Sequence, residues 1–196
     1  MPGHHRKVNE GTLLFARSFF RHPRMLGSVI PSSRFLIREV LRPVDWERAR
    51  VIVEYGPGVG SITAEILRRM RPDARLIAIE MHSDFVRYLR NTFDDERLQV
   101  IEGSAADVED ILRQAGCEKA SYIISGIPFS TLPAALREHI LRKSCAVLEP
   151  GGEFLVYQFS TRVLRDLQRV FGCVRRRFEP LNVLPAHLFF CQPQAA

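Results

Sequence analysis

From Arg50 onward, short apolar runs rich in β-branched residues alternate with segments whose apolar residues recur at helical spacing. The first five runs are almost continuously apolar, which is typical of parallel strands covered by helices on both faces. The runs predict strands over residues 50–56, 75–80, 98–103, 121–127, 153–159, 174–181 and 186–192. The intervening segments predict helices over residues 61–69, 83–93, 108–115, 133–148 and 162–171.

The connections between these elements predict the topology. Pro150, Gly151 and Gly152 are expected to end the fourth helix and turn the chain into the fifth strand. Only a short stretch, residues 182–185, separates the last two strands, so they are expected to form an antiparallel hairpin. The pattern therefore predicts an α/β, Rossmann-like fold: a seven-stranded, mostly parallel sheet with an antiparallel last strand and helices on both faces.

A different pattern precedes the first strand, and it divides the chain into an N-terminal amphipathic helical segment, residues 1–45, and a sheet domain, residues 46–196. A helical wheel of the segment gathers phenylalanines on one face and arginines at its edge, as in helices that lie on anionic membranes. An ordinary helix that packs its phenylalanines on the sheet domain would give the same pattern. The candidate membrane-binding residues are Phe15, Arg17, Phe19, Phe20, Arg21 and Arg24.

Composition and charge limit the classes of protein to which this chain can belong. The 196 residues suffice for one well-buried core, and the net charge of +6 is carried almost wholly by arginine, which suits phosphate in nucleic acid or on a membrane surface. No apolar run is long enough to predict a spanning helix, and the N-terminus lacks the pattern of a signal peptide, so a cytoplasmic location is expected. The widely spaced cysteines include no C-x-x-C pair, so no metal site is expected.

The candidate chemistry begins at the sequence EYGPGVG, which ends the first strand and opens the first helix. Gly56, Gly58 and Gly60 let the backbone turn sharply and approach a ligand at the helix N-terminus. Glu80 ends the next strand, about twenty residues further on, where an acid can accept both hydroxyls of a ribose. A tight turn with a separate surface acid is the alternative, but all four features in register indicate a ribose-bearing cofactor.

The glycine spacing is shorter than the G-x-G-x-x-G of nicotinamide and flavin folds. E-x-G-x-G-x-G, with an acid ending the next strand, resembles motif I of the class I S-adenosylmethionine-dependent methyltransferases. The resemblance implies S-adenosyl-L-methionine as cofactor and S-adenosyl-L-homocysteine as product. The cofactor-binding residues that it implies here are Glu54, Gly56, Gly58, Gly60, Glu80, Met81, Gly103, Ser104 and Ala105. Ser104 stands where the family usually has an acid, so the adenine contact is either weaker or made elsewhere, as by Asp107.

The fourth strand ends in SGIPF, which resembles the (D/N/S)-x-P-(Y/F) sequence of methyltransferases that act on amino groups. The resemblance implies a substrate site at Ser125, Gly126 and Phe129, with Ser125 also near the cofactor. The serine hydroxyl can accept from an amine N–H, and the phenylalanine face can support a developing cation. A proline turn with a core phenylalanine is the alternative. Tyr157, near the end of the fifth strand, either binds substrate or fills the core, and no strong general base is identified.

From about Phe15 to Cys191 the chain resembles bacterial phospholipid N-methyltransferases, which convert phosphatidylethanolamine stepwise to phosphatidylcholine. The resemblance rests on FFRHPRMLGSVIPSSRFL, VEYGPGVGSIT, SGIPFSTLP, LEPGGEFLVYQFS and LNVLPAHLFFC, although the tryptophan frequent in the family's first helix is absent. It implies that Ser32 and Ser33, in the P-S-S element, contact the cofactor and that residues 1–45 cover it against the membrane. The expected partners are a phospholipid substrate and an anionic membrane surface, with the protein bound peripherally to the inner membrane.

The ribosomal RNA adenine dimethyltransferases resemble the same core but carry a further helical domain. Because the chain reaches Ala196 soon after the last predicted strand, no nucleic-acid partner is expected. The alternatives that the sequence leaves open are an RNA adenine or small-molecule amine N-methyltransferase, and a non-catalytic lipid-surface protein that binds the cofactor.

Overall fold

The computed structural model describes residues 33–182 and 184–194. The predicted membrane-binding residues between Phe15 and Arg24, and Ser32 of the P-S-S element, lie outside this range. The helices are α3 (Arg34–Val40), α4 (Ser61–Arg69), α5 (Ser83–Thr92), α6 (Val108–Gln114), α7 (Ala134–Val147) and α8 (Leu164–Val170), with 3₁₀ turns η2 (Ala105–Asp107) and η3 (Phe129–Thr131). The strands are β1 (Val51–Tyr55), β2 (Arg75–Glu80), β3 (Leu98–Glu102), β4 (Ala120–Ser125), β5 (Leu148–Gln158), β6 (Cys173–Glu179) and β7 (Ala186–Gln192).

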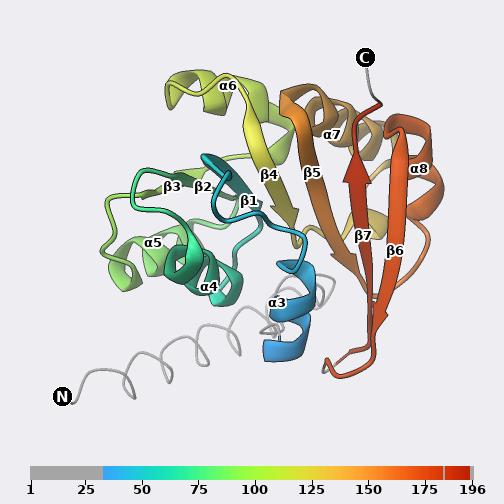
Figure 1. Ribbon diagram of the computed structural model, residues 1–196, viewed down its shortest axis with the longest axis horizontal. Helices are drawn as coiled ribbons and strands as arrows, with labels where there is room; N and C mark the ends of the chain where they lie inside the picture. Colours follow the sequence, from blue (N-terminus) through green and yellow to red (C-terminus); the bar gives the residue numbers. More distant parts are fainter. Residues whose placement is uncertain (1–32, 183, 195–196) are drawn as a thin grey trace.

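The strands form one seven-stranded sheet in the order β3-β2-β1-β4-β5-β7-β6 (Figure 1). Strands β1 to β5 pair in parallel, whereas β7 runs antiparallel to both β5 and β6. This arrangement confirms the predicted fold. The order reverses beside β1, between its neighbours β2 and β4, which is the position where open sheets of this kind leave a crevice for ligands.

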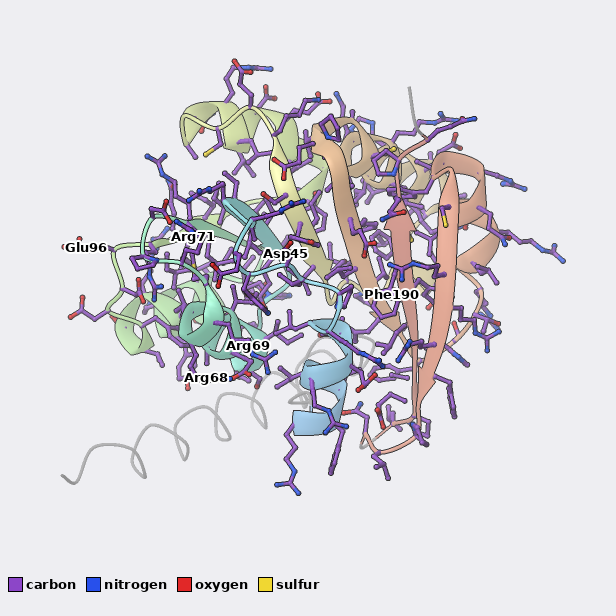
Figure 2. All side chains as sticks on the ribbon, viewed as in Figure 1. Asp45, Arg68, Arg69, Arg71, Glu96 and Phe190 are labelled. Carbon is purple, nitrogen blue, oxygen red and sulfur yellow. The ribbon has the colours of Figure 1, made fainter. Side chains whose placement is uncertain are left out.

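Helices cover both faces of the sheet, as the continuous apolar strands predict. On one face, α6, α7 and α8 pack on side chains such as Val53, Ile123 and Phe154. On the other face, α3 and α4 pack on Ile52 and Leu155, and α5 packs on β3. Figure 2 labels Phe190, which belongs to β7 and is buried in the core beneath α3.

Helix α3 belongs to this core although it precedes the predicted domain boundary at residue 45. Leu36, Val40 and Leu41 have no solvent-exposed surface and contact the sheet domain. The boundary itself stays a prediction, because the preceding residues are outside the described range. Among the described residues, no helix is both long and apolar enough to cross a bilayer.

The predicted elements lie within a few residues of the observed ones, with one larger difference at β5. The strand begins at Leu148, not at Glu153, because Leu148 already pairs with Ala120 of β4. The register then shifts before Tyr122 pairs with Glu153, and Gly151 has a positive φ of 83° within that irregularity. Pro150 and the two glycines after it therefore form a bulge inside the strand, and α7 has already ended at Val147.

Candidate active site

The carboxyl ends of β1, β2, β3 and β4 meet at one edge of the sheet, where the predicted site residues were expected. Tyr55 pairs with Ile79 on one side and with Ser125 on the other, and Glu80 pairs with Glu102. The residue that follows β1, β3 or β4 still donates a backbone hydrogen bond to a neighbouring strand, as in the 2.9 Å bond from the Gly126 N–H to the Tyr55 carbonyl. These bonds fix the positions of the loops that follow.

The glycine turn after β1 requires glycine at three positions. Gly56, Gly58 and Gly60 have φ values of 66°, 56° and 78°, in the left-handed region that other residues rarely adopt. At Gly60 there is also no room for a side chain, because a Cβ atom would lie 2.5 Å from the Phe93 ring. The turn therefore leads directly into the N-terminus of α4, where no side chain caps the helix.

Glu80 connects the glycine turn to the end of β2. Its Oε2 accepts a hydrogen bond of 3.2 Å from the Gly58 N–H, and its Oε1 accepts one of 3.0 Å from the His82 N–H. The carboxylate is thus held by two backbone donors, and each oxygen retains a lone pair for a further donor. This is the arrangement that two ribose hydroxyls need, and it places the acid where the sequence predicts it.

Glu54 lies on β1 beneath the turn and is almost fully buried. Its Oε2 accepts a hydrogen bond of 2.6 Å from the Thr63 hydroxyl of α4. The pKa of the Glu54 carboxyl is raised to about 7, chiefly because the group is buried; the Thr63 bond opposes this rise and the nearby Glu80 carboxylate adds to it. Glu54 is not on the cavity wall described below, so its role as a cofactor ligand stays a prediction.

This buried acid predicts a pH dependence of stability. Because the folded-state pKa of Glu54 is about 7 and the ordinary value is 4.5, the folded protein retains a proton that the unfolded chain releases. Its contribution is therefore fully present below pH 4.5 and is lost as the pH rises through 7, by about 3 kcal/mol in all. Glu54→Gln removes the titrating group, so we expect the variant to show no such loss. The free energy of unfolding in urea, taken as variant minus wild type, should therefore increase between pH 5 and pH 8. Glu102→Gln, at an exposed carboxylate, serves as the control, and an equal effect of Glu54→Gln at both pH values would contradict the prediction.

A cavity of about 290 Å³ opens beside the turn and Glu80. Six predicted cofactor residues line it: Gly56, Glu80, Met81, Gly103, Ser104 and Ala105. Ser104 also caps η2, because its Oγ accepts a 3.1 Å hydrogen bond from the Ala106 N–H. Asp107, the proposed substitute for the missing acid, is exposed and is not on the cavity wall.

The predicted substrate residues lie directly behind this wall. Ser125 is fully buried, and its Oγ accepts a 3.3 Å hydrogen bond from the Ile127 N–H, which shapes the turn after β4. Gly126 has no space for a side chain, because a Cβ atom would lie 2.5 Å from the Tyr157 hydroxyl. Phe129 is also fully buried and packs edge to face on Phe154. The structure thus brings Ser125, Gly126 and Tyr157 together but places Phe129 in the core, and their catalytic roles stay predictions.

Ser33 has a structural role that the sequence does not reveal. Its Oγ accepts from the Leu36 N–H and so caps α3. The same hydroxyl donates to the Leu181 carbonyl at 3.0 Å, and the Ser33 N–H donates to Asn182 Oδ1 at 2.9 Å. Ser33 therefore joins α3 to the β6–β7 loop, and it is not on the cavity wall.

Part of the cavity wall was not predicted from the sequence. Leu132, just after η3, and Leu136 and Ile140 of α7 bring an apolar stripe at four-residue spacing to the cavity. That spacing was the available signal, although it equally predicts an ordinary buried helix face. The other unpredicted wall residues are Ile79, His82, Ile127, Pro128 and Thr131.

The residues present fit S-adenosylmethionine. Glu80 offers two carboxylate oxygens for the ribose, the glycine turn offers close backbone approach, and the wall between β2 and α7 is apolar enough to hold an adenine ring. Among the described residues on the wall, Glu80 is the only one with a formal charge, and it is negative. A cofactor with a sulfonium group would meet no positive side chain among these described wall residues.

Comparison with known proteins identifies the family. Residues 52–152 match the family described as a methyltransferase domain. An ornithine lipid N-methyltransferase of Singulisphaera acidiphila is 39% identical over 91% of this chain and 94% of its own length. A ribosomal RNA small subunit methyltransferase A of Mycoplasma mycoides is 30% identical over 50% of this chain, and the match spans only 39% of that relative.

The solved structures agree with the fold. The crystal structure of a precorrin-6y C5,15-methyltransferase from Geobacter metallireducens superposes with a TM-score of 0.62 at 14% identity, covering 81% of this chain and 88% of that one. The glycine turn, the acid at the end of β2 and the reversed β7 thus occur in a chain whose sequence matches a methyltransferase domain over half its length. This protein belongs to the class I S-adenosylmethionine-dependent methyltransferases and uses S-adenosylmethionine as its cofactor.

Proposed function

We propose that this protein transfers methyl groups from S-adenosylmethionine to the primary amine of a membrane lipid. The observation that carries the proposal is the relationship to the lipid N-methyltransferase, which extends over nearly the whole of both chains. The relationship to the ribosomal RNA enzyme, in contrast, covers half of this chain. The lipid acceptor therefore has better support than an RNA adenine.

The charge of the cavity supports an amine as the acceptor. The protein carries a net charge of +6, yet among the described residues the cavity wall carries only the negative charge of Glu80. An ammonium group and its methylated forms would be repelled by arginines at such a site, and none lines the cavity within the described residues. A carboxylate or phosphate acceptor would gain nothing from this wall.

The chain's own residues act mainly by binding and positioning. When bound, S-adenosylmethionine supplies an electrophilic methyl group on a sulfonium sulfur. Glu80 binds the ribose, the apolar stripe of Leu132, Leu136 and Ile140 excludes water, and the turn after β4, which the Ser125 hydroxyl shapes, borders the cavity with Ile127 and Pro128. Holding the amine in line with the methyl group accounts for much of the rate, and its proton is released to water.

Two acceptors fit the proposal, and both carry a primary amine on a lipid. The sequence resemblance favours phosphatidylethanolamine, methylated stepwise to phosphatidylcholine, whereas the relative from Singulisphaera acidiphila is an ornithine lipid N-methyltransferase. The proposed site of membrane contact is the N-terminal segment around Phe19 and Phe20, with the protein bound peripherally. These finer assignments stay proposals.

Methyl transfer to purified lipids tests the function. The full-length protein is incubated with radiolabelled S-adenosylmethionine and detergent micelles that contain phosphatidylethanolamine, ornithine lipid or phosphatidylglycerol, and the lipids are then extracted and separated. We expect label in one of the two amine lipids and none in phosphatidylglycerol, which has no nitrogen. Mass spectrometry then counts the methyl groups. Label found only in added RNA or in water-soluble amines would reject a lipid acceptor.

A further inference from the structure

The β6–β7 hairpin presents apolar side chains to solvent at the same edge of the sheet as the cavity. Gln158, at the carboxyl end of β5, pairs with His187 of β7, so the loop between β6 and β7 extends beyond that edge. Phe178, Leu181 and Leu184, which we call the hairpin tip, are 54%, 61% and 39% exposed. They are three of the five large apolar side chains exposed among the described residues. Their grouping at the end of one hairpin indicates a contact surface.

The loop between β6 and β7 is held by hydrogen bonds within the hairpin and to Ser33. The Leu181 N–H donates to Glu179 Oε1 at 2.7 Å, and the Leu181 carbonyl accepts from the Ser33 hydroxyl. Asn182 is buried, accepts from the Ser33 N–H and donates to the Leu184 carbonyl at 2.9 Å. The loop therefore satisfies much of its own backbone polarity while it exposes its leucines. This combination suits the boundary between lipid headgroups and acyl chains, where backbone groups find little water.

Positive charge adjoins the hairpin tip. The arginine cluster, as we call it, consists of Arg38 of α3, Arg42 just after that helix and Arg177 of β6. All three approach one carboxylate, that of Glu39, at 3.5, 3.6 and 3.3 Å. Three guanidinium groups against one carboxylate leave an excess of two positive charges. Figure 1 shows α3 beside the hairpin loop, as the bonds of Ser33 require. Leu181 and Leu184 therefore lie beside the arginine cluster, whereas Phe178, next to Arg177 in β6, points to the other face of the hairpin, where it packs on His187.

We propose that the hairpin tip and the arginine cluster together dock the protein on an anionic phospholipid bilayer. The leucines enter the headgroup layer, and the arginines pair with lipid phosphates. The proposal rests on the proposed function, because docking at this edge turns the cavity toward the membrane that holds the acceptor. A nucleic acid would satisfy the arginines but leave the apolar tip in water, so the combination favours a bilayer.

Vesicle binding tests the two parts of the surface separately. Co-sedimentation is measured with vesicles of phosphatidylethanolamine and phosphatidylglycerol for Leu181→Ser with Leu184→Ser, and for Arg38→Gln with Arg42→Gln. Each arginine near an anionic surface contributes about fivefold to binding, so the arginine pair is expected to lower the partition coefficient by about 25-fold. We expect the leucine pair to lower it by about tenfold. Calorimetry with S-adenosylhomocysteine verifies that each variant is folded.

Arg48→Gln with Arg113→Gln is the matched control. Both arginines are exposed, and the change in net charge is the same. Arg48 precedes β1 and Arg113 is near the end of α6, so both lie toward the amino edge of the sheet, away from the tip (Figure 1). We expect this control to retain most of the wild-type vesicle binding. An equal loss in the control would show that binding follows net charge alone and would overturn the proposal.

A tryptophan at the hairpin tip gives a second, independent measurement. Trp46 is the only tryptophan of the chain, so Leu181→Trp combined with Trp46→Phe leaves one reporter, and Arg113→Trp in the same background is its control. We expect a blue shift of emission with anionic vesicles for the first variant alone. No shift with vesicles, a shift already present in buffer, or a shift with RNA and not with vesicles would each overturn the proposal.

The two proposals fail in different ways. Wild-type protein that binds vesicles through the hairpin tip but methylates no lipid in detergent micelles would reject the lipid acceptor and leave the docking surface intact. Wild-type protein that methylates lipid in micelles, with vesicle binding unaffected by both variant pairs, would reject the docking surface and leave the acceptor intact.

Discussion

Replacing Gly60 with alanine is expected to lower the free energy of unfolding by about 3 kcal/mol. The φ of 78° at Gly60 costs an alanine roughly 1–2 kcal/mol. The new methyl group would also lie 2.5 Å from the Phe93 ring and 2.9 Å from Leu89, which is overpacking that costs about 1–3 kcal/mol. Because such a domain has about 5–15 kcal/mol of stability in total, urea unfolding should show a large fall in midpoint.

Gly151→Ala is the matched control for this prediction. Gly151 has a similar φ of 83°, but nothing lies within 4 Å of the added methyl group. Its cost should therefore be that of the backbone conformation alone, about 1–2 kcal/mol. If Gly60→Ala costs no more than Gly151→Ala, the α4–α5 packing yields easily and the close approach of Gly60 to Phe93 is not what requires the glycine.

Several features of the fold and of the candidate site could be predicted from the sequence. Local spacing was sufficient for the strand, the turn and the acid, because each depends on residues within one βα unit. The antiparallel pairing of the last two strands followed from the short connection between them, which leaves no room for a crossover helix. The irregular start of β5 was missed because a Pro-Gly-Gly sequence signals a turn, whereas pairing with β4 absorbs it as a bulge.

The parts that sequence reasoning missed depend on contacts between distant segments. Ser33 bonds to Asn182, 149 residues away, and no local pattern indicates that pairing. The arginine cluster likewise forms only because β6 brings Arg177 to Glu39 of α3. The raised pKa of Glu54 follows from burial under α4, which is a property of the assembled core. The contribution of α7 to the cavity wall likewise depends on how segments distant in the sequence pack together.

At the carboxyl edge of the sheet, the cavity wall and the outer surface differ in charge, and each charge suits a different task of the proposed enzyme. The described part of the cavity wall carries one negative charge, which suits a cationic cofactor and an amine. The arginine cluster, in contrast, is at the outside of the same edge beside the hairpin tip. A basic protein can therefore attract an anionic membrane without placing positive charge where the reacting amine must bind.

Replacing Glu80 with alanine is expected to weaken binding of S-adenosylhomocysteine by about 1–3 kcal/mol, or from about fivefold to more than a hundredfold in Kd. The change removes both carboxylate oxygens predicted to hold the ribose. It also leaves the N–H groups of Gly58 and His82 without their acceptor, so the turn itself loosens. Isothermal titration calorimetry measures the affinity, and thermal unfolding without ligand separates the loss of contacts from the loosening of the turn.

Glu102→Ala is the control, because Glu102 pairs directly with Glu80 across the sheet and ends β3 at the same edge. Its side chain is exposed and is not part of the cavity wall, so we expect an unchanged Kd. Glu80→Gln keeps one acceptor oxygen, which can serve only one of the two backbone donors, and its affinity should fall between the wild type and Glu80→Ala. Equal affinity of Glu80→Ala and Glu102→Ala for S-adenosylhomocysteine would show that the ribose does not bind at the end of β2. The glycine turn would then hold the cofactor without help from Glu80, although Glu80 is hydrogen bonded to that turn.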